Sequence, residues 1–445
     1  MATQCLSGDV AVWINRLARL LDPRLSWRLL PLLTGLLFAT GRRTVSSWLR
    51  AGGLSKDYQD YYYFVWSLGH KVKWLAAVVL EIGVGVIVPQ GRILLAIDDT
   101  PSKRYGPKVE GAGIHHNPTP GPAGVKFVYG HVWVTLAWIV RHPLWGAIGL
   151  PLLARLYVRR KDIDGQQLPF LRQVTFQTKL VMAGELVAWA ATWLKSLGRT
   201  LWVVADGAYA KRVFLRAAAA AHVIVVSRLR KDAALFDVPV PPKRRGRGRP
   251  RTYGKKAISL AKRAGQPRGW QLGTFALYGA EVSKRYKTFL ATYKPASGLI
   301  RVVLVKEDDG DWRAYFCTQT DATVAEILEA VADRSALEQV FHDVKEVHGV
   351  GQAQTRNYWS NVAVYHLKLW LHTLIELWAW RRPAHQLVDR QLSPWDDADR
   401  RPSHADKRNA LRRQCLEDEF QAGAALGTVP RKITSLWRRV VRLVA

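Results

Sequence analysis

Carboxylates follow short apolar runs at two places in the chain, and a third acidic residue lies on a later amphipathic segment. Asp98 and Asp99 come directly after the run Ile93–Ile97, and Asp206 comes directly after Leu201–Ala205. Glu338 lies far downstream. Hard divalent cations such as Mg²⁺ prefer oxygen ligands, and carboxylates supply both coordination and charge. One aspartate of the pair Asp98–Asp99, together with Asp206 and Glu338, could hold two Mg²⁺ (or Mn²⁺) ions, which would assist an in-line phosphoryl transfer.

The elements that must position these residues can be read from hydrophobic periodicity. Continuous apolar runs predict buried strands, and longer periodic segments predict helices. The predicted strands are 93–97, 127–133, 134–140, 201–205 and 222–226, and the predicted helices are 170–197, 208–221 and 321–348, the last with an N-cap at Asp321 and a break near Asp333. Three strands, a helix, a strand, a helix, a strand and a late helix is the element order of a ribonuclease H-like core. We therefore predict an α/β fold with a mixed sheet.

The late segment carries charge and apolar residues on separate stripes. Arg334, Glu338, His342 and Lys345 share one helical face, while Leu337, Val340, Phe341 and Val344 form the neighbouring apolar stripe. Packing of the apolar stripe would hold Glu338 at the edge of the buried face. We expect Arg334 and Lys345 to contact the phosphates of bound DNA. The alternative is an exposed helix with ordinary ion pairs.

Three motifs resemble those of bacterial insertion-sequence transposases of the DDE superfamily. They are Asp98-Asp-Thr100 with Lys103-Arg-Tyr-Gly106, Val203-Val-Ala-Asp206-Gly-Ala-Tyr209, and Arg334-x3-Glu338-x6-Lys345. Val331 stands where the family's third motif has tyrosine. The resemblance implies an RNase H-like DDE endonuclease that cleaves transposon ends and transfers the strand into target DNA. It also implies a homodimer in the synaptic complex.

Asp98 and Asp99 are competing candidates for the first ligand. Neighbouring residues on a strand point to opposite faces, so only one of the two carboxylates can face the metals. The position directly before Thr100 matches the family motif, which favours Asp99.

The charge of the chain indicates a polyanionic partner. Lysine and arginine total 66 against 35 acidic residues, for a formal net charge of +31. Nucleic acid is the commonest partner of such a chain, with a membrane surface as second candidate. The densest basic segment contributes the candidate DNA-binding residues Lys243, Arg244, Arg245, Arg247, Arg249 and Arg251. This segment either resembles an AT-hook in the minor groove or contacts phosphates without sequence preference.

Composition sets the expected organisation. We predict a helical DNA-binding or packing region over 1–90, core segments over 91–228 and 321–350, a basic β-rich insertion over 229–320, and a helical C-terminal region over 351–445. Three cysteines without C-x-x-C spacing and no signal-peptide layout fit a cytoplasmic, nucleoid-associated bacterial protein without a membrane partner. A nuclease that does not join strands and a non-enzymatic DNA-binding descendant of a transposase stay open as alternatives.

Overall fold

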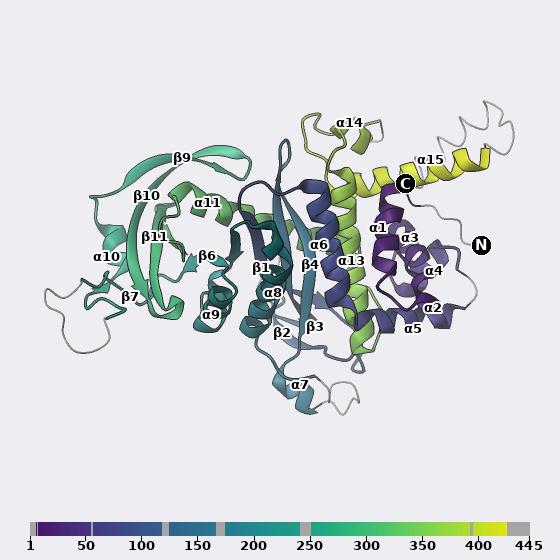
Figure 1. Ribbon diagram of the computed structural model, residues 1–445, viewed down its shortest axis with the longest axis horizontal. Coiled ribbons are helices and arrows are strands. Elements are labelled where there is room, and N and C mark those ends of the chain that lie inside the picture. Colours follow the sequence, from purple (N-terminus) through teal and green to yellow (C-terminus); the bar gives the residue numbers. More distant parts are fainter. Residues whose placement is uncertain are drawn as a thin grey trace.

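The computed structural model describes residues 6, 8–54, 57–117, 124–165, 174–240, 251–391 and 395–424. Figure 1 shows a β-rich part at one end, a sheet covered by helices in the middle, and the N-terminal helices at the other end.

The central sheet contains the strands β1 (Ile93–Lys103), β3 (Phe127–His142), β4 (Gly146–Tyr157), β5 (Leu201–Ala205) and β6 (Ile224–Leu229). β3 pairs antiparallel with β1 and β4, whereas β5 lies parallel to β1 and to β6. The order β4-β3-β1-β5-β6, with only the first three strands alternating in direction, is the ribonuclease H-like arrangement. The predicted fold class is confirmed. A short strand, β2 (Gly113–His116), pairs with the start of β3.

One part of the strand prediction was wrong. The segments 127–133 and 134–140 are not two strands but one continuous strand, β3, and the third strand of the core is β4. No turn-forming residue separates Trp133 from Val134. The chain instead reverses at residues 143–145, before Gly146 with its positive φ of 71°. Glycine tolerates this left-handed conformation, which is why the hairpin closes there.

Helices cover the two faces of the central sheet. α8 (Lys179–Leu194) packs against β3, β4 and α9 (Arg212–Ala220), while α12 (Ser335–Glu346) packs against β4, β1 and β3. α11 (Val324–Asp333) comes directly before α12, and Arg334 separates the two helices, close to the predicted break near Asp333. The predicted N-cap at Asp321 was wrong. Thr323 caps α11, because its side chain and that of Glu326 satisfy each other's backbone N–H groups.

The β-rich insertion continues the central sheet. Its elements are β7 (Leu235–Phe236), β8 (Ala257–Ile258), α10 (Leu260–Gly265), β9 (Gln271–Leu277), β10 (Ala280–Tyr293), β11 (Gly298–Lys306) and β12 (Trp312–Cys317). β12 pairs antiparallel with β6, so core and insertion form one hydrogen-bonded sheet of 12 strands among the described residues.

Helices from both ends of the chain pack beside the core. The N-terminal ones are α1 (Gly8–Ala18), α2 (Pro23–Ser26), α3 (Leu29–Phe38), α4 (Val45–Ala51), α5 (Tyr58–Gly69) and α6 (Val72–Ile87), and the C-terminal ones are α13 (Tyr358–Ala379), α14 (Ala384–Leu387) and α15 (His404–Ala424). α7 (Arg160–Gly165) follows β4. α13 runs beside β4, to the right of it in Figure 1.

Side chains of α13 form hydrogen bonds with backbone groups of the edge strand β4. Trp370 Nε1 donates to Leu152 O at 2.8 Å, and Thr373 Oγ1 donates to Pro151 O at 2.7 Å. Ala154 N donates to His366 Nε2 at 3.0 Å. An uncovered edge strand exposes unpaired backbone groups, and α13 supplies partners for these three.

Within the described ranges, one helical stretch is long and apolar enough to cross a membrane by length and composition, Lys179–Leu197. Packing of this stretch against β3, β4 and α9 accounts for its apolar residues.

Candidate active site

Strand β1 presents two adjacent carboxylates at the end of its buried run. Ile93 to Ile97 are fully buried or nearly so, and Asp98 and Asp99 are only partly exposed. The pairings Asp98↔Thr135 and Asp99↔Val134 keep both residues within the regular ladder with β3. Their side chains therefore point to opposite faces of the sheet.

Asp98 lies on the face covered by α12. Arg334 Nη1 donates to Asp98 Oδ2 at 2.6 Å, and Arg334 Nη2 donates to Glu338 Oε1 at 2.5 Å. Burial lowers the pKa of Arg334, but the negative charges of Asp98, Glu338 and Asp206 outweigh it, and the net pKa is raised. One guanidinium thus links carboxylates from β1 and α12 and interacts with a third carboxylate at the end of β5.

Burial raises the pKa of Asp98 to about 6, against the opposing effects of Arg334 and a hydrogen bond from the Asp99 backbone. The charges of Asp99 and Asp206 add to the increase. A partly buried carboxylate beside two others is costly to ionise without a cation, so this position favours binding of positive charge.

Asp206 is brought beside Asp98 by the parallel pairing of β5 with β1, in which Ala205 lies opposite Ile97. All five residues of β5 are buried, whereas Asp206 is exposed. Ser227 Oγ donates to the backbone carbonyl of Asp206 at 3.1 Å, which anchors the turn after the strand.

Asp99 has a different environment. Its Oδ2 lies 2.5 Å from Lys179 Nζ on α8, and its Oδ1 accepts a hydrogen bond from Tyr209 OH at 2.9 Å. Burial and the charge of Asp99 raise the pKa of Tyr209 far above its usual range, so the phenol stays a donor. The structure therefore brings Asp98, Asp206 and Glu338 together around Arg334 and places the favoured residue, Asp99, against Lys179 and Tyr209. Sequence analysis missed both partners, because neither lies near Asp99 in the chain.

The position of α12 depends on a glycine in β4. A Cβ atom on Gly149 would lie 2.7 Å from Val340 Cγ2 and 2.9 Å from Ala336 O. Contacts this short do not occur, so only glycine lets the helix approach the sheet this closely. The approach sets the height of Glu338 above the strand ends.

A cavity of about 1180 Å³ begins near the end of α12. Lys345 lines it together with Arg42, Lys103, Tyr105 and Gln352. Burial lowers the pKa of Lys345. Lys345 follows Glu338 by two helical turns, about 10 Å along the axis. This cleft is therefore basic, and the lysine that lines it lies about two helical turns from Glu338.

Arg104 fixes the wall of this cleft. Its buried guanidinium donates to the backbone carbonyls of Ala353 and Thr355, and to Asn361 Oδ1 at 2.6 Å. The segment between α12 and α13 is thereby tied to the end of β1. Because Arg104 is buried, its neighbours Lys103 and Tyr105 are exposed at the cleft.

The structure describes one residue of the predicted basic DNA-binding segment, Arg251. Lys243, Arg244, Arg245, Arg247 and Arg249 lie outside the described residues. Arg251 is exposed between β7 and β8, on the insertion.

Comparison with known proteins addresses the family of the chain. No curated protein sequence matches it. Among solved structures, the cryo-EM structure of the piggyBac transposase synaptic complex with hairpin DNA aligns with a TM-score of 0.36 and 10% identity, over 93% of this chain and 85% of that one. The family model described as transposase DDE domain matches residues 184–374. The model described as DDE superfamily endonuclease matches residues 21–276, more than half of the chain. The chain belongs to the DDE superfamily endonucleases.

Proposed function

We propose that the protein is a DNA transposase that cleaves the ends of its element and joins them to target DNA, with Asp98, Asp206 and Glu338 as its metal-binding carboxylates. The observation that carries this proposal is the position of Arg334. A single guanidinium contacts Asp98 and Glu338 and interacts electrostatically with Asp206. The three carboxylates therefore face a common centre that accepts positive charge.

The donor set fits Mg²⁺ or Mn²⁺. Carboxylate oxygens are the hard ligands that both ions prefer, and the raised pKa of Asp98, to about 6, is the expected response of a carboxylate placed where a cation belongs. When bound, two such ions would stabilise the attacking and leaving oxygens of phosphoryl transfer and promote ionisation of a water molecule. Asp98 and Asp206 would hold this centre from rigid strands, and Glu338 from α12.

Asp99, the ligand favoured by the family motif, is assigned a positioning role in this proposal. The carboxylate of Asp99 contacts Lys179 at the start of α8 and Tyr209 just after Asp206, whereas that of Asp98 shares Arg334 with Glu338. Asp99 would therefore hold the turn that carries Asp206 and the first residue of α8. Its loss would displace Asp206 without removing a ligand.

The proposed DNA path follows positive charge. Arg334 and Lys345 lie at the two ends of α12, and Lys103 and Arg42 line the adjoining cleft. We assign these residues to the phosphates of double-stranded DNA near the scissile bond, and the basic segment containing Arg251 to DNA further away. In this proposal two copies of the chain act together on paired element ends in the bacterial cytoplasm, at the nucleoid.

The assignment is tested by incubating four variants with DNA carrying the element's own ends and Mg²⁺ or Mn²⁺. Asp98→Asn, Asp206→Asn and Glu338→Gln should lose cleavage and joining while DNA binding is retained. Asp99→Asn should keep measurable cleavage, and Asp232→Asn on the exposed surface should match the wild type. Full cleavage by Asp98→Asn together with none by Asp99→Asn would return the ligand role to Asp99. Cleavage without joined products would identify a nuclease instead of a transposase.

A further inference from the structure

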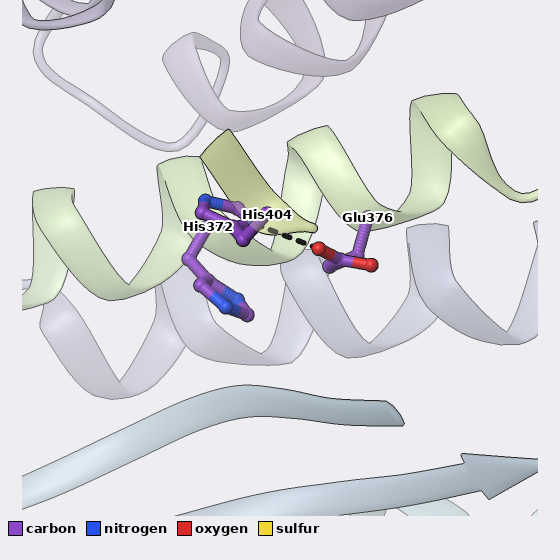
Figure 2. Close-up of side chains that lie close together, drawn as sticks. All are labelled: His372, Glu376 and His404. Carbon is purple, nitrogen blue, oxygen red and sulfur yellow. Dashed lines mark hydrogen bonds and ion pairs between the residues drawn. The ribbon is translucent and has the colours of Figure 1, made fainter. Parts of the chain in front are cut away.

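A second cluster of metal-binding side chains lies in the helical layer, away from the carboxylates of the cleavage site. It is formed by His372 and Glu376 on α13 and His404 at the start of α15. All three are buried, with side chains between 1% and 4% exposed. Figure 2 shows the two histidine rings and the carboxylate gathered between the helices.

Glu376 and His404 are already oriented toward each other. His404 Nδ1 lies 2.7 Å from Glu376 Oε1, the interaction drawn as a dashed line in Figure 2. Lys407 Nζ donates to the other carboxylate oxygen, Oε2, at 2.5 Å. The far nitrogen of His404, Nε2, lies 2.8 Å from His348 Nε2. Outer contacts therefore hold both groups and leave Glu376 Oε1 and His404 Nδ1 on the inner side of the cluster.

His372 is the residue that indicates a missing ligand. Neither of its ring nitrogens has a hydrogen-bond partner, although the residue is only 2% exposed. The nearest carboxylate oxygen, Asp343 Oδ2, is 3.7 Å from Nε2, too far for a hydrogen bond. A buried polar group without a partner is destabilising, so native proteins rarely leave one unpaired. On this ring, Nε2 faces only Asp343 at that distance, Nδ1 has no hydrogen-bond partner, and both lie beside His404 and Glu376.

We propose that His372, Glu376 and His404 bind one divalent transition-metal ion of the Zn²⁺ class. Their ligand atoms lie within 4.8 Å of one another, and the rings of His372 and His404 stack with centroids 3.9 Å apart, so rotation of the two rings would turn one nitrogen of each toward a shared ion. Two imidazoles and one carboxylate form a set that binds Zn²⁺ and related ions more strongly than Mg²⁺. The site is thus chemically distinct from the all-carboxylate centre.

The surroundings of the cluster suit this assignment. His348 lies behind His404, where outer-shell partners usually orient metal-bound imidazoles. A cavity of about 350 Å³ reaches all three ligands and provides a route for the ion and room for a water as fourth ligand.

The place of the site in the fold suggests its role. Asp343 belongs to α12, five residues after Glu338, while the ligands come from α13 and α15. Binding of one ion would join the two C-terminal helices directly behind the helix that carries Glu338. The ion would then stabilise the support of the cleavage site without taking part in the phosphoryl transfer.

The test measures metal content and metal uptake by the full chain. Protein purified without chelators should contain about one zinc ion per chain, measured by mass spectrometry of the elements. After removal by a chelator, one equivalent of Zn²⁺ or Co²⁺ should rebind and raise the melting temperature, and Co²⁺ should give the visible absorption of a low-coordinate histidine site. His372→Asn and Glu376→Gln should each lose this ion.

Two controls separate the site from other histidines and from the cleavage centre. His342→Asn, at an exposed histidine on α12, and Glu338→Gln should both keep one zinc per chain. A wild-type chain that neither contains nor takes up Zn²⁺ or Co²⁺ would overturn the proposal, whatever the variants do. Retention of the ion by folded His372→Asn would overturn it as well.

Discussion

The guanidinium of Arg334 lies 2.6 Å from the carboxylate of Asp98, across 236 positions of sequence. This ion pair connects the start of α12 to the end of the buried run of β1. Both side chains are about one-fifth exposed, so water screens the pair only in part. The same arginine contacts Glu338. Its guanidinium therefore occupies the position between the two carboxylates that a metal ion would need.

Replacing Arg334 should separate metal binding from catalysis. Arg334→Gln frees Asp98 and Glu338, so Mn²⁺ affinity of the DNA-free protein should increase by about tenfold, or about 1.4 kcal/mol. Cleavage should nevertheless fall by about 100-fold, since a cationic group beside the reacting phosphate is lost. Electron paramagnetic resonance of free Mn²⁺ measures the affinity, at a pH well above the Asp98 pKa of about 6.

Arg141→Gln is the matched control for that experiment. Arg141 forms a comparable pair of ion pairs with Glu329 and Asp333 on α11, away from the carboxylates. Its loss should leave the affinity for Mn²⁺ unchanged. An unchanged affinity in Arg334→Gln too would mean that the arginine does not compete with the ion.

Enlarging Gly149 should disturb α12. The added Cβ of Gly149→Ala meets Val340 and the backbone of Ala336, so the helix must shift. We expect unfolding free energy to fall by about 1–3 kcal/mol and cleavage to fall with it. Gly85→Ala in α6, where a Cβ meets nothing within 4 Å, should instead raise stability slightly, because alanine favours a helix. Equal stability of the two variants in urea unfolding would contradict the close approach.

Lysines that line the cleft should contribute to DNA binding by contacting the phosphates of the DNA. Lys345→Ala and Lys103→Ala should each lower DNA affinity and reduce the dependence of log Kd on log salt by about one unit of slope. The effect should be the same for all DNA sequences, because phosphate contacts carry no base information. Lys195→Ala, at the exposed end of α8, is the control. A salt dependence identical to wild type in both cleft variants would place the DNA elsewhere.

His366 should make stability depend on pH. Its Nδ1 donates to Val362 O at 2.7 Å and its Nε2 accepts from Ala154 N, an arrangement available only to the neutral ring. Burial lowers its pKa to about 4, below the usual 6.5. Its contribution is therefore complete above the unfolded-state pKa and is lost as the pH falls from 6.5 toward 4, at about 1.4 kcal/mol per pH unit.

Urea unfolding across this pH range measures the loss. His366→Gln should flatten the pH dependence, while His342→Gln at the exposed ring of α12 should not. A pH profile of His366→Gln that superimposes on the wild-type profile would show that folding leaves the pKa of His366 unchanged.

Sequence patterns predicted the carboxylate-bearing elements because each has a strong local signal. An apolar run that ends in aspartate predicts a buried strand, and both runs form one; β5 ends at Ala205 as expected, whereas β1 continues past Asp98 to Lys103. The break at Arg334 between two amphipathic segments was equally readable. The β3–β4 hairpin was missed, since β3 is buried along nearly its whole length and shows no alternation.

Other features depend on contacts between distant segments. The faces of Asp98 and Asp99 are set by the pairing register of β1 and by which helix covers each face, and neither is encoded in the adjacent residues. His372 and Glu376 are spaced one helical turn apart, but their partner His404 comes from another helix. A histidine and a glutamate one turn apart on a helix are common in protein cores. Only the fold, which brings His404 beside them, distinguishes this pair from the others.

The pairing of β12 with β6 has a mechanical consequence for the insertion. β6 is bonded to β5, the strand that ends at Asp206, so an unbroken series of backbone hydrogen bonds extends from the carboxylates to β10 and β9. If the insertion binds DNA, a force on that DNA would be transmitted through this continuous sheet to the strand that carries Asp206. Shortening or lengthening β10 should then change where the chain cuts relative to the sequence it holds.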